Sequence, residues 1–175
     1  MELFLIVLRN IFIAIAIIYA VLLIVSISFV ASFASILSHH NNDLSLIITN
    51  KRDVLVTLST LLSNDGVKLD KKQLDTLNNF DLKRTENQSK EEAKIAREEL
   101  TSLSEYFLLK VSENNKENAS DEYHRVLENI QELDTVYRQR LMMYNADVLG
   151  YNFWISFFPT RFVFKIFRLK KKDTI

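Results

Sequence analysis

A Tyr-Asn pair occurs twice in the last quarter of the chain. Among the polar side chains of the sequence, these are the strongest candidates for a binding site. Tyr144-Asn145 recurs seven residues later as Tyr151-Asn152. Seven residues make two helical turns, so both pairs lie on one face of one helix. The same period includes Val148 and Ile155, and the pattern ends at Phe158-Pro159. A phenol and a carboxamide both donate and accept hydrogen bonds, so this face can hold a ligand or a buried polar layer.

We expect the polar layer. Inside a helical bundle, Asn145 and Asn152 would hydrogen-bond with a Tyr hydroxyl and with Asp53 of an earlier helix, which fixes the register of the helices. Buried polar groups in helical bundles are best attested in that role. The alternative interpretation is a ligand pocket built on the same groups.

The His residues do not form a metal-binding pattern. His39 and His40 are adjacent, so on a helix they point roughly 100° apart. His124 follows Asp121 at i+3, but a di-metal bundle needs two Glu-x-x-His motifs and further Glu residues. We therefore predict no metal site.

Other catalytic arrangements also lack their sequence context. A Ser nucleophile has no strand–elbow–helix signature here, and the two glycines, Gly66 and Gly150, cannot form a Gly-rich phosphate loop. The chain has no Cys, which excludes a thiolate nucleophile and a disulfide framework. We predict no catalytic residue and no cofactor.

The last fifteen residues combine basic and aromatic side chains. Arg161, Lys165, Arg168 and Lys172 are spaced to form one basic helical stripe, and the other side carries Phe162, Val163, Ile166 and Phe167. A helix of this kind suits the surface of an anionic membrane. We expect lipid contact by Arg161, Phe162, Lys165, Ile166, Phe167, Arg168 and Lys172. The alternative is that residues 162–169 only cap the open end of a bundle.

A long uncharged run near the N-terminus predicts a membrane anchor. No residue from Ile11 to Leu37 is charged, and about 20 apolar residues cross a bilayer core of roughly 30 Å. We place the span at residues 11–30. A cleaved signal peptide is the alternative, although its apolar region is usually about 7–15 residues. The basic tail favours a short N-terminus outside the cell membrane and a cytoplasmic domain.

Composition favours long helices. The 175 residues contain only two Gly and one Pro, and Lys plus Arg equals Asp plus Glu at 22 each, so no global charge indicates nucleic acid. The first helix is expected to leave the membrane without a break and end at Asn64-Asp65-Gly66. Asp70 would cap a short second helix, a third would run over 90–112, and Ser120 would cap a fourth that ends at Pro159. Residues 83–91 read as a loop.

The chain resembles the LemA family. The resemblance rests on the Tyr-Asn repeat with Phe158-Pro159, and on Lys51-Arg52-Asp53-Val54-Leu55, which is similar to that family's basic-basic-x-Asp-Leu-Ile-Pro segment. Tyr123, Val126, Ile130 and Asp134 fall at further family positions, and the N-terminal helix completes the match. Val56 stands in place of the family's Pro, and Phe167-Arg168-Leu169 in place of a Phe-Gly-Phe. The resemblance implies a divergent member of a bacterial family, with a helical bundle on a single anchor and no implied enzyme activity.

These inferences predict an all-α protein whose N-terminal transmembrane helix continues into an antiparallel four-helix bundle. The expected parts are an anchor at 1–34, a bundle at 35–159 and a basic aromatic tail at 160–175. The expected role is a scaffold or adaptor at the cell membrane with an unidentified protein partner. A self-assembling membrane-organising protein is the alternative, and an enzyme is a third possibility.

Overall fold

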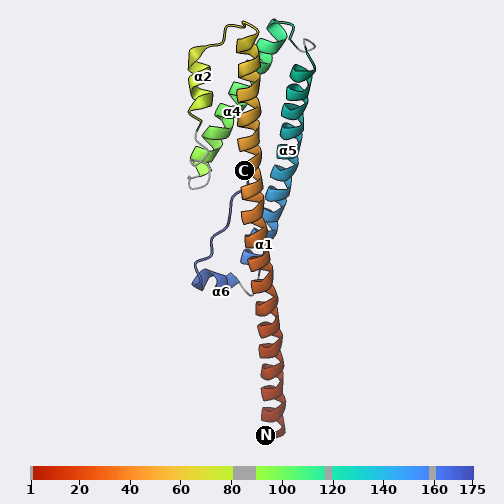
Figure 1. Cartoon of the computed structure of the whole chain (residues 1–175). Helices are drawn as coiled ribbons and strands as arrows, with labels where there is room; N and C mark the ends of the chain where they lie inside the picture. Colours follow the sequence, from red (N-terminus) through yellow and green to blue (C-terminus); the bar gives the residue numbers. More distant parts are fainter. Residues whose placement is uncertain (1, 81–89, 117–119, 158–160) are drawn as a thin grey trace. The chain divides into compact units, whose positions relative to one another are not determined.

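Helices are the only regular secondary structure in the parts of the chain that the structure describes. A computed structural model describes residues 2–80, 90–116, 120–157 and 161–175 (Figure 1). Its helices are α1 (Glu2–Asn64), α2 (Lys71–Asn78), α4 (Lys90–Glu113), α5 (Asp121–Ser156) and α6 (Arg161–Ile166). No strand occurs among the described residues. The predicted all-α class is confirmed, while the predicted loop at 83–91 and the stop at Phe158-Pro159 fall largely outside the described residues.

The helices form two compact units. One contains Met1–His40 and Met142–Ile175, and the other contains Asn41–Leu141. The expected parts at 1–34, 35–159 and 160–175 stay a prediction, since they separate an anchor, a bundle and a tail rather than compact units. The end of α5 and the predicted tail fall into the same unit as the start of α1.

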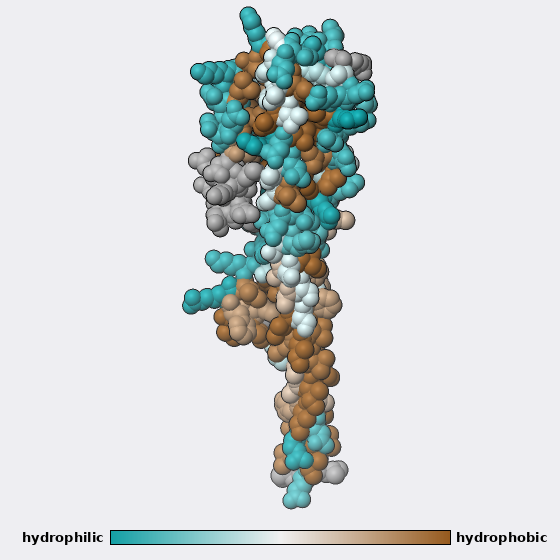
Figure 2. Space-filling model, in the orientation of Figure 1, coloured by the Kyte–Doolittle hydropathy of each residue, from teal (hydrophilic) through white to brown (hydrophobic). Residues whose placement is uncertain are grey.

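The first half of α1 has the composition of a membrane span. It is a single 63-residue helix, and its N-terminal part is long and apolar enough to cross a bilayer. Large apolar side chains such as Phe12, Ile17 and Ile24 are more than half exposed there. Figure 2 shows this stretch as a mostly hydrophobic surface, with hydrophilic atoms near the N-terminal end.

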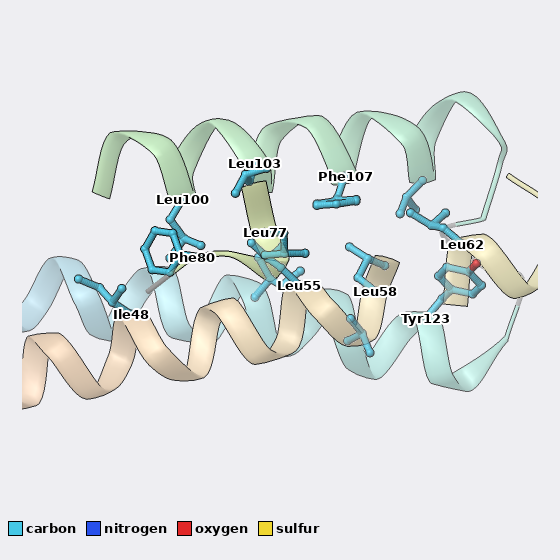
Figure 3. Close-up of a cluster of buried hydrophobic side chains, with 13 residues drawn as sticks. Ile48, Leu55, Leu58, Leu62, Leu77, Phe80, Leu100, Leu103, Phe107 and Tyr123 are labelled. Atoms are coloured by element: carbon cyan, nitrogen blue, oxygen red, sulfur yellow. The ribbon is translucent and has the colours of Figure 1, made fainter. Parts of the chain in front are cut away.

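The core of the unit Asn41–Leu141 is built from helical stripes. Stripes at i, i+3, i+4 and i+7 bury one side of each helix, as the sequence predicts. Four helices contribute to one cluster, labelled in part in Figure 3: Ile48, Leu55, Leu58 and Leu62 of α1, Leu77 of α2 with Phe80 just after it, Leu100, Leu103, Phe107 and Val111 of α4, and Tyr123, Val126 and Ile130 of α5.

Capping residues end α1 and begin α2 at the positions that the sequence predicts. Gly66 adopts φ +75° after α1, its N–H donates to the carbonyl of Ser63, and the N–H of Val67 donates to the carbonyl of Leu62. This is a Schellman closure, in which a left-handed residue satisfies the last carbonyls of a helix. Asp70 then caps α2, since its carboxylate accepts the N–H of Lys72 at 2.9 Å.

The C-terminal segment differs from the predicted amphipathic helix. Helix α6 ends at Ile166, Arg168 adopts φ +55°, and the N–H groups of Arg168 and Leu169 donate to the carbonyls of Lys165 and Phe164. This second Schellman closure stops the helix, and residues 169–175 carry no regular structure. The basic stripe is therefore interrupted, because Arg168 lies in the turn and Lys172 lies beyond it.

Candidate functional site

The seven-residue pattern on α5 produces a buried face in the first unit. Tyr144, Val148, Tyr151 and Ile155 are all buried, which is the helical periodicity that the sequence predicts. Asn145 follows Tyr144, and Asn152 follows Tyr151, so each lies one step round the helix at the edge of this face. Both are half-buried.

Each of these Asn side chains binds the backbone of the C-terminal segment through two hydrogen bonds. Asn152 Nδ2 donates to the carbonyl of Lys172 at 2.6 Å, and the N–H of Lys172 donates to Asn152 Oδ1 at 2.8 Å. Asn145 Nδ2 donates to the carbonyl of Ile175 at 2.9 Å, and the N–H of Ile175 donates to Asn145 Oδ1 at 2.9 Å. We call these four bonds the Asn clamp. Residues 169–175, which are an irregular segment and not a β-strand, are called the tail strand. Each carboxamide pairs with one residue much as a neighbouring strand would.

The distances along the two segments match. Seven residues of α-helix span about 10.5 Å. The three residue steps from Lys172 to Ile175 span about 10 Å when the chain is extended. The order is reversed, because the later Asn holds the earlier tail residue. The tail strand therefore runs antiparallel to α5.

A side-chain contact accompanies the clamp. The Lys172 ammonium lies over the ring of Tyr151, 5.2 Å from its centroid, which is a cation–π geometry. Burial raises the pKa of Tyr151 above its ordinary value. The phenol is therefore neutral at neutral pH.

The expected polar layer takes a different form. The described hydrogen bonds of Asn145 and Asn152 go to the tail backbone, whereas Asp53 is exposed and pairs with the neighbouring Arg52 at 2.9 Å. The two Asn residues at the edge of the buried face contact the tail strand. Because the tail strand is not helical, its N–H and C=O groups need partners outside its own backbone. The signal in the sequence was the seven-residue spacing of two carboxamides, which fits an extended backbone.

Helix α5 also packs closely on α1 within this unit. The Trp154 ring stacks on Phe29 with centroids 4.5 Å apart and planes 5° from parallel. A Cβ added at Gly150 would lie 2.7 Å from the ring of Phe33. Gly150 is thus a close-approach position, which the sequence interpretation had not used.

Helix α6 leaves an apolar surface uncovered. Phe164 is buried, whereas Phe162, Ile166 and Phe167 are 58%, 79% and 68% exposed. The expected lipid-contact residues Arg161, Lys165 and Arg168 are also exposed. Lys172 differs from them, because its backbone is clamped and its ammonium lies over Tyr151.

In the other unit, Asp65 is the centre of a polar cluster. Its Oδ2 accepts the Tyr123 hydroxyl at 3.2 Å and pairs with Lys116 Nζ at 2.9 Å. The hydrogen bond from Lys116 lowers the pKa of Asp65. Burial, followed by the bond to Asp65, raises the pKa of Tyr123 to about 12. This cluster ties the end of α1 to the start of α5.

A small cleft also lies in that unit. Lys51 Nζ pairs with Asp134 Oδ1 at 2.6 Å in its wall, and the space encloses about 50 Å³. Further lining residues are Ile47, Ile48, Arg97, Leu100, Thr101 and Tyr137. Sites for small organic ligands usually have roughly 300–1,000 Å³, so this cleft has room for water-sized occupants.

Two of the three His residues lie close to carboxylates. His40 Nε2 lies 3.2 Å from Asp147, and the exposed His124 lies 3.2 Å from Glu128, one turn along the same helix. Within the described ranges, no three His, Cys, Asp or Glu side chains are grouped so that they could hold a metal ion.

Comparisons with known proteins give no relative. No family model, no curated protein and no solved structure matches this chain.

Proposed function

We propose that the protein is a single-pass membrane protein that acts as an adaptor. The observation that carries the proposal is the composition of α1. One continuous helix exposes an apolar stretch of membrane length, and its later residues Leu55, Leu58 and Leu62 belong to the core of a helical unit. In this proposal, residues 11–30 are the span, the short N-terminus is outside the cell membrane and the unit Asn41–Leu141 is cytoplasmic.

An antiparallel four-helix bundle is the arrangement that we propose for that unit. The order of its contacts supports it. Asp65, near the end of α1, contacts Tyr123 at the start of α5, and the earlier Lys51 contacts the later Asp134. Helices joined in this order run in opposite directions.

Contact between α6 and the membrane surface is part of the proposal. Exposed Phe162, Ile166 and Phe167 supply apolar area, and Arg161 and Lys165 supply positive charge. The stack of Trp154 on Phe29 also supports a position at the membrane interface. Phe29 lies at the end of the proposed span, and Trp is enriched at membrane interfaces.

The polar groups of the first unit support the proposed adaptor role. The most specific polar contacts of the first unit bind a peptide backbone. We also propose that the chain is a divergent LemA-like protein. In support, the Gly of the family's Phe-Gly-Phe corresponds to Arg168, which adopts the left-handed conformation that Gly favours.

The absence of Cys allows a direct test of the topology. Single Cys residues would be introduced at Glu2 and at the exposed Thr57, and intact cells would be treated with a membrane-impermeant maleimide. We expect labelling of Glu2→Cys alone, with Thr57→Cys labelled only after lysis. Carbonate washing should leave both variants in the membrane pellet. Labelling of both sites in intact cells, or a mature N-terminus near Ser35, would contradict the anchor.

A further inference from the structure

We propose that the Asn clamp is a peptide-binding site for an extended segment of a partner protein, and that the tail strand is its intramolecular occupant. The clamp contacts only the N–H and C=O groups of Lys172 and Ile175. Every non-proline residue carries these groups, so the clamp accepts many sequences. This proposal names the kind of ligand that the adaptor would bind, and it rests on the proposed adaptor function.

The spacing of the clamp selects the backbone conformation. It meets residues three apart, and about three residues per turn is the repeat of an extended left-handed strand, which rises roughly 3.1 Å per residue. A segment of this form brings the backbone of every third residue to the same side. A helical ligand would span only about 4.5 Å over three residues and could not reach both carboxamides.

Two further features define the side chains of the ligand. The first is Tyr151, whose ring faces the Lys172 ammonium and therefore favours Lys or Arg at the position paired with Asn152. The second is an uncovered apolar stripe on α5. Met142 lies three residues before Asn145, and Leu149 lies three residues before Asn152. Their side chains are 65% and 64% exposed, and Phe153 is 58% exposed. Residues three and four apart are neighbours on a helix, so this stripe flanks the clamp.

The stripe indicates a partner rather than a second copy. Between its two clamped residues, the tail strand has Asp173 and Thr174, both exposed. Another copy would offer the same polar pair and would leave Leu149 equally uncovered. A segment with a basic residue at the Lys172 position and apolar residues at the next two would make the clamp contacts and cover apolar area as well. We therefore expect such a segment to displace the tail strand.

The test uses the full-length chain and a variant that ends at Leu169, both in the same detergent or nanodisc. The probe is a fluorescent peptide of residues 169–175, followed by anisotropy. We expect saturable binding to the truncated variant and about tenfold weaker binding to the full chain, in which the tail strand competes. Asn145→Ala or Asn152→Ala in the truncated variant should weaken binding by about tenfold, the effect of losing two hydrogen bonds. Asn129→Ala, an exposed Asn elsewhere on α5, is the matched control.

Modified peptides separate backbone recognition from other binding. N-methylation at Lys172 or Ile175 removes a donor to the clamp and should weaken binding, whereas N-methylation at Lys171 or Thr174 should have a smaller effect. Replacing Asp173 and Thr174 by Leu should tighten binding several-fold, by about the value of the apolar area covered. Leu149→Ser should abolish that gain.

Several results would overturn the proposal. They are no saturable binding to the truncated variant at about 1 mM peptide, equal effects of N-methylation at all positions, or unchanged binding to the Asn variants. Tail-dependent dimers of the full chain would assign the site to a second copy instead. Membrane attachment is measured separately by the labelling experiment above, so failure of the anchor and failure of the peptide site are distinguishable.

Discussion

Asn152 holds both backbone groups of Lys172, with its Nδ2 2.6 Å from the carbonyl oxygen and its Oδ1 2.8 Å from the amide nitrogen. One side chain thus fixes the position and direction of the tail strand. Because the contact is local to the first unit, its loss should release the tail strand without unfolding the core cluster of the other unit.

The first prediction tests this locality. Asn145→Ala should free Ile175, and Asn152→Ala should free Lys172, each at a local cost of about 1–3 kcal/mol for the loss of two hydrogen bonds. Amide hydrogen exchange at the freed residue should accelerate by about tenfold or more. Asn129→Ala should leave both rates unchanged. If instead either variant lowers the unfolding temperature of the whole protein with no change in tail exchange, the Asn residues belong to a buried register layer after all.

The second prediction concerns the approach of α5 to α1 at Gly150. Gly150→Ala places a methyl 2.7 Å from the Phe33 ring, so the ring must move. Overpacking of this kind costs about 1–3 kcal/mol. Ala in a helix interior recovers only about 0.5–1 kcal/mol relative to Gly. We therefore expect net destabilisation in thermal unfolding followed by circular dichroism.

A second substitution provides the control for Gly150. Phe33→Leu is smaller at the point of contact, so the double variant Phe33→Leu with Gly150→Ala should be more stable than the sum of the single effects predicts. Strict additivity of the two changes would show that the methyl does not meet the Phe33 ring.

The third prediction concerns the turn after α6. Arg168 adopts φ +55°, which costs an L-residue roughly 1–2 kcal/mol that Gly does not pay. Arg168→Gly should strengthen the turn, and exchange of the Leu169 amide, which donates to Phe164, should slow about fivefold. Arg168→Val should speed it. Faster exchange in Arg168→Gly would mean that the Arg side chain, and not the backbone, stabilises this turn.

The fourth prediction concerns the pKa values of Asp65, which follows α1, and Tyr123, at the start of α5. The pKa of Tyr123 rises from 10.0 to about 12 in the folded protein. A raised pKa means that the stabilisation is complete below pH 10 and is lost as the pH rises toward about 12. The pKa of Asp65 is lowered, so its contribution is present above its unfolded value of 3.8 and is lost as the pH falls through the lower folded value.

Denaturant unfolding at a series of pH values checks this prediction. Tyr123→Phe should flatten the loss of stability between pH 10 and about 12, and it should leave the acidic side nearly unchanged because Lys116 still pairs with Asp65. Tyr106→Phe removes a Tyr hydroxyl of the same unit that accepts the N–H of Asp70 at 2.7 Å, so it is the control for the loss of a hydrogen-bonded hydroxyl. An alkaline profile that is identical in wild type and Tyr123→Phe would contradict the assignment.

Local signals in the sequence predicted much of the fold. Gly66 and Asp70 marked the end of α1 and the cap of α2, because a left-handed residue and a capping carboxylate act through their immediate neighbours. The stripes of α4 and α5 were also predictable. Leu103 and Phe107 of α4 are four residues apart, as are Val126 and Ile130 of α5, which is helical spacing.

Contacts between distant segments were not predictable in the same way. The basic stripe continued through Arg168 at helical spacing, but nothing in that spacing indicated a left-handed residue there. Asn145 and Asn152 were recognised as one face, yet their partners lie 30 and 20 residues away in sequence and offer only backbone groups. A backbone partner leaves no trace in the identity of its residue, so the pattern alone favoured a polar layer.

The last prediction uses Trp154, the only Trp of the chain, as a probe of depth. It stacks on Phe29 and lies close to Phe153 and Phe157. If these aromatics lie at the membrane interface, as we propose, Trp154 fluorescence in reconstituted vesicles should be quenched more by lipids brominated near the headgroup than by lipids brominated near the chain end. Phe29→Leu should broaden the dependence on depth, because it removes the stacked ring that orients the indole.

Helix α6 should contribute to the same measurement. Replacing Phe162, Ile166 and Phe167 by Ser removes exposed apolar side chains without touching the buried Phe164, so quenching from the headgroup region should fall while helicity is retained. Met142→Ser on α5 is the control for loss of an exposed apolar side chain outside α6. Quenching that is strongest from the chain end would place Trp154 inside the bilayer and move the end of the span beyond residue 30. No quenching from either position would separate the Trp154 cluster and α6 from the membrane altogether.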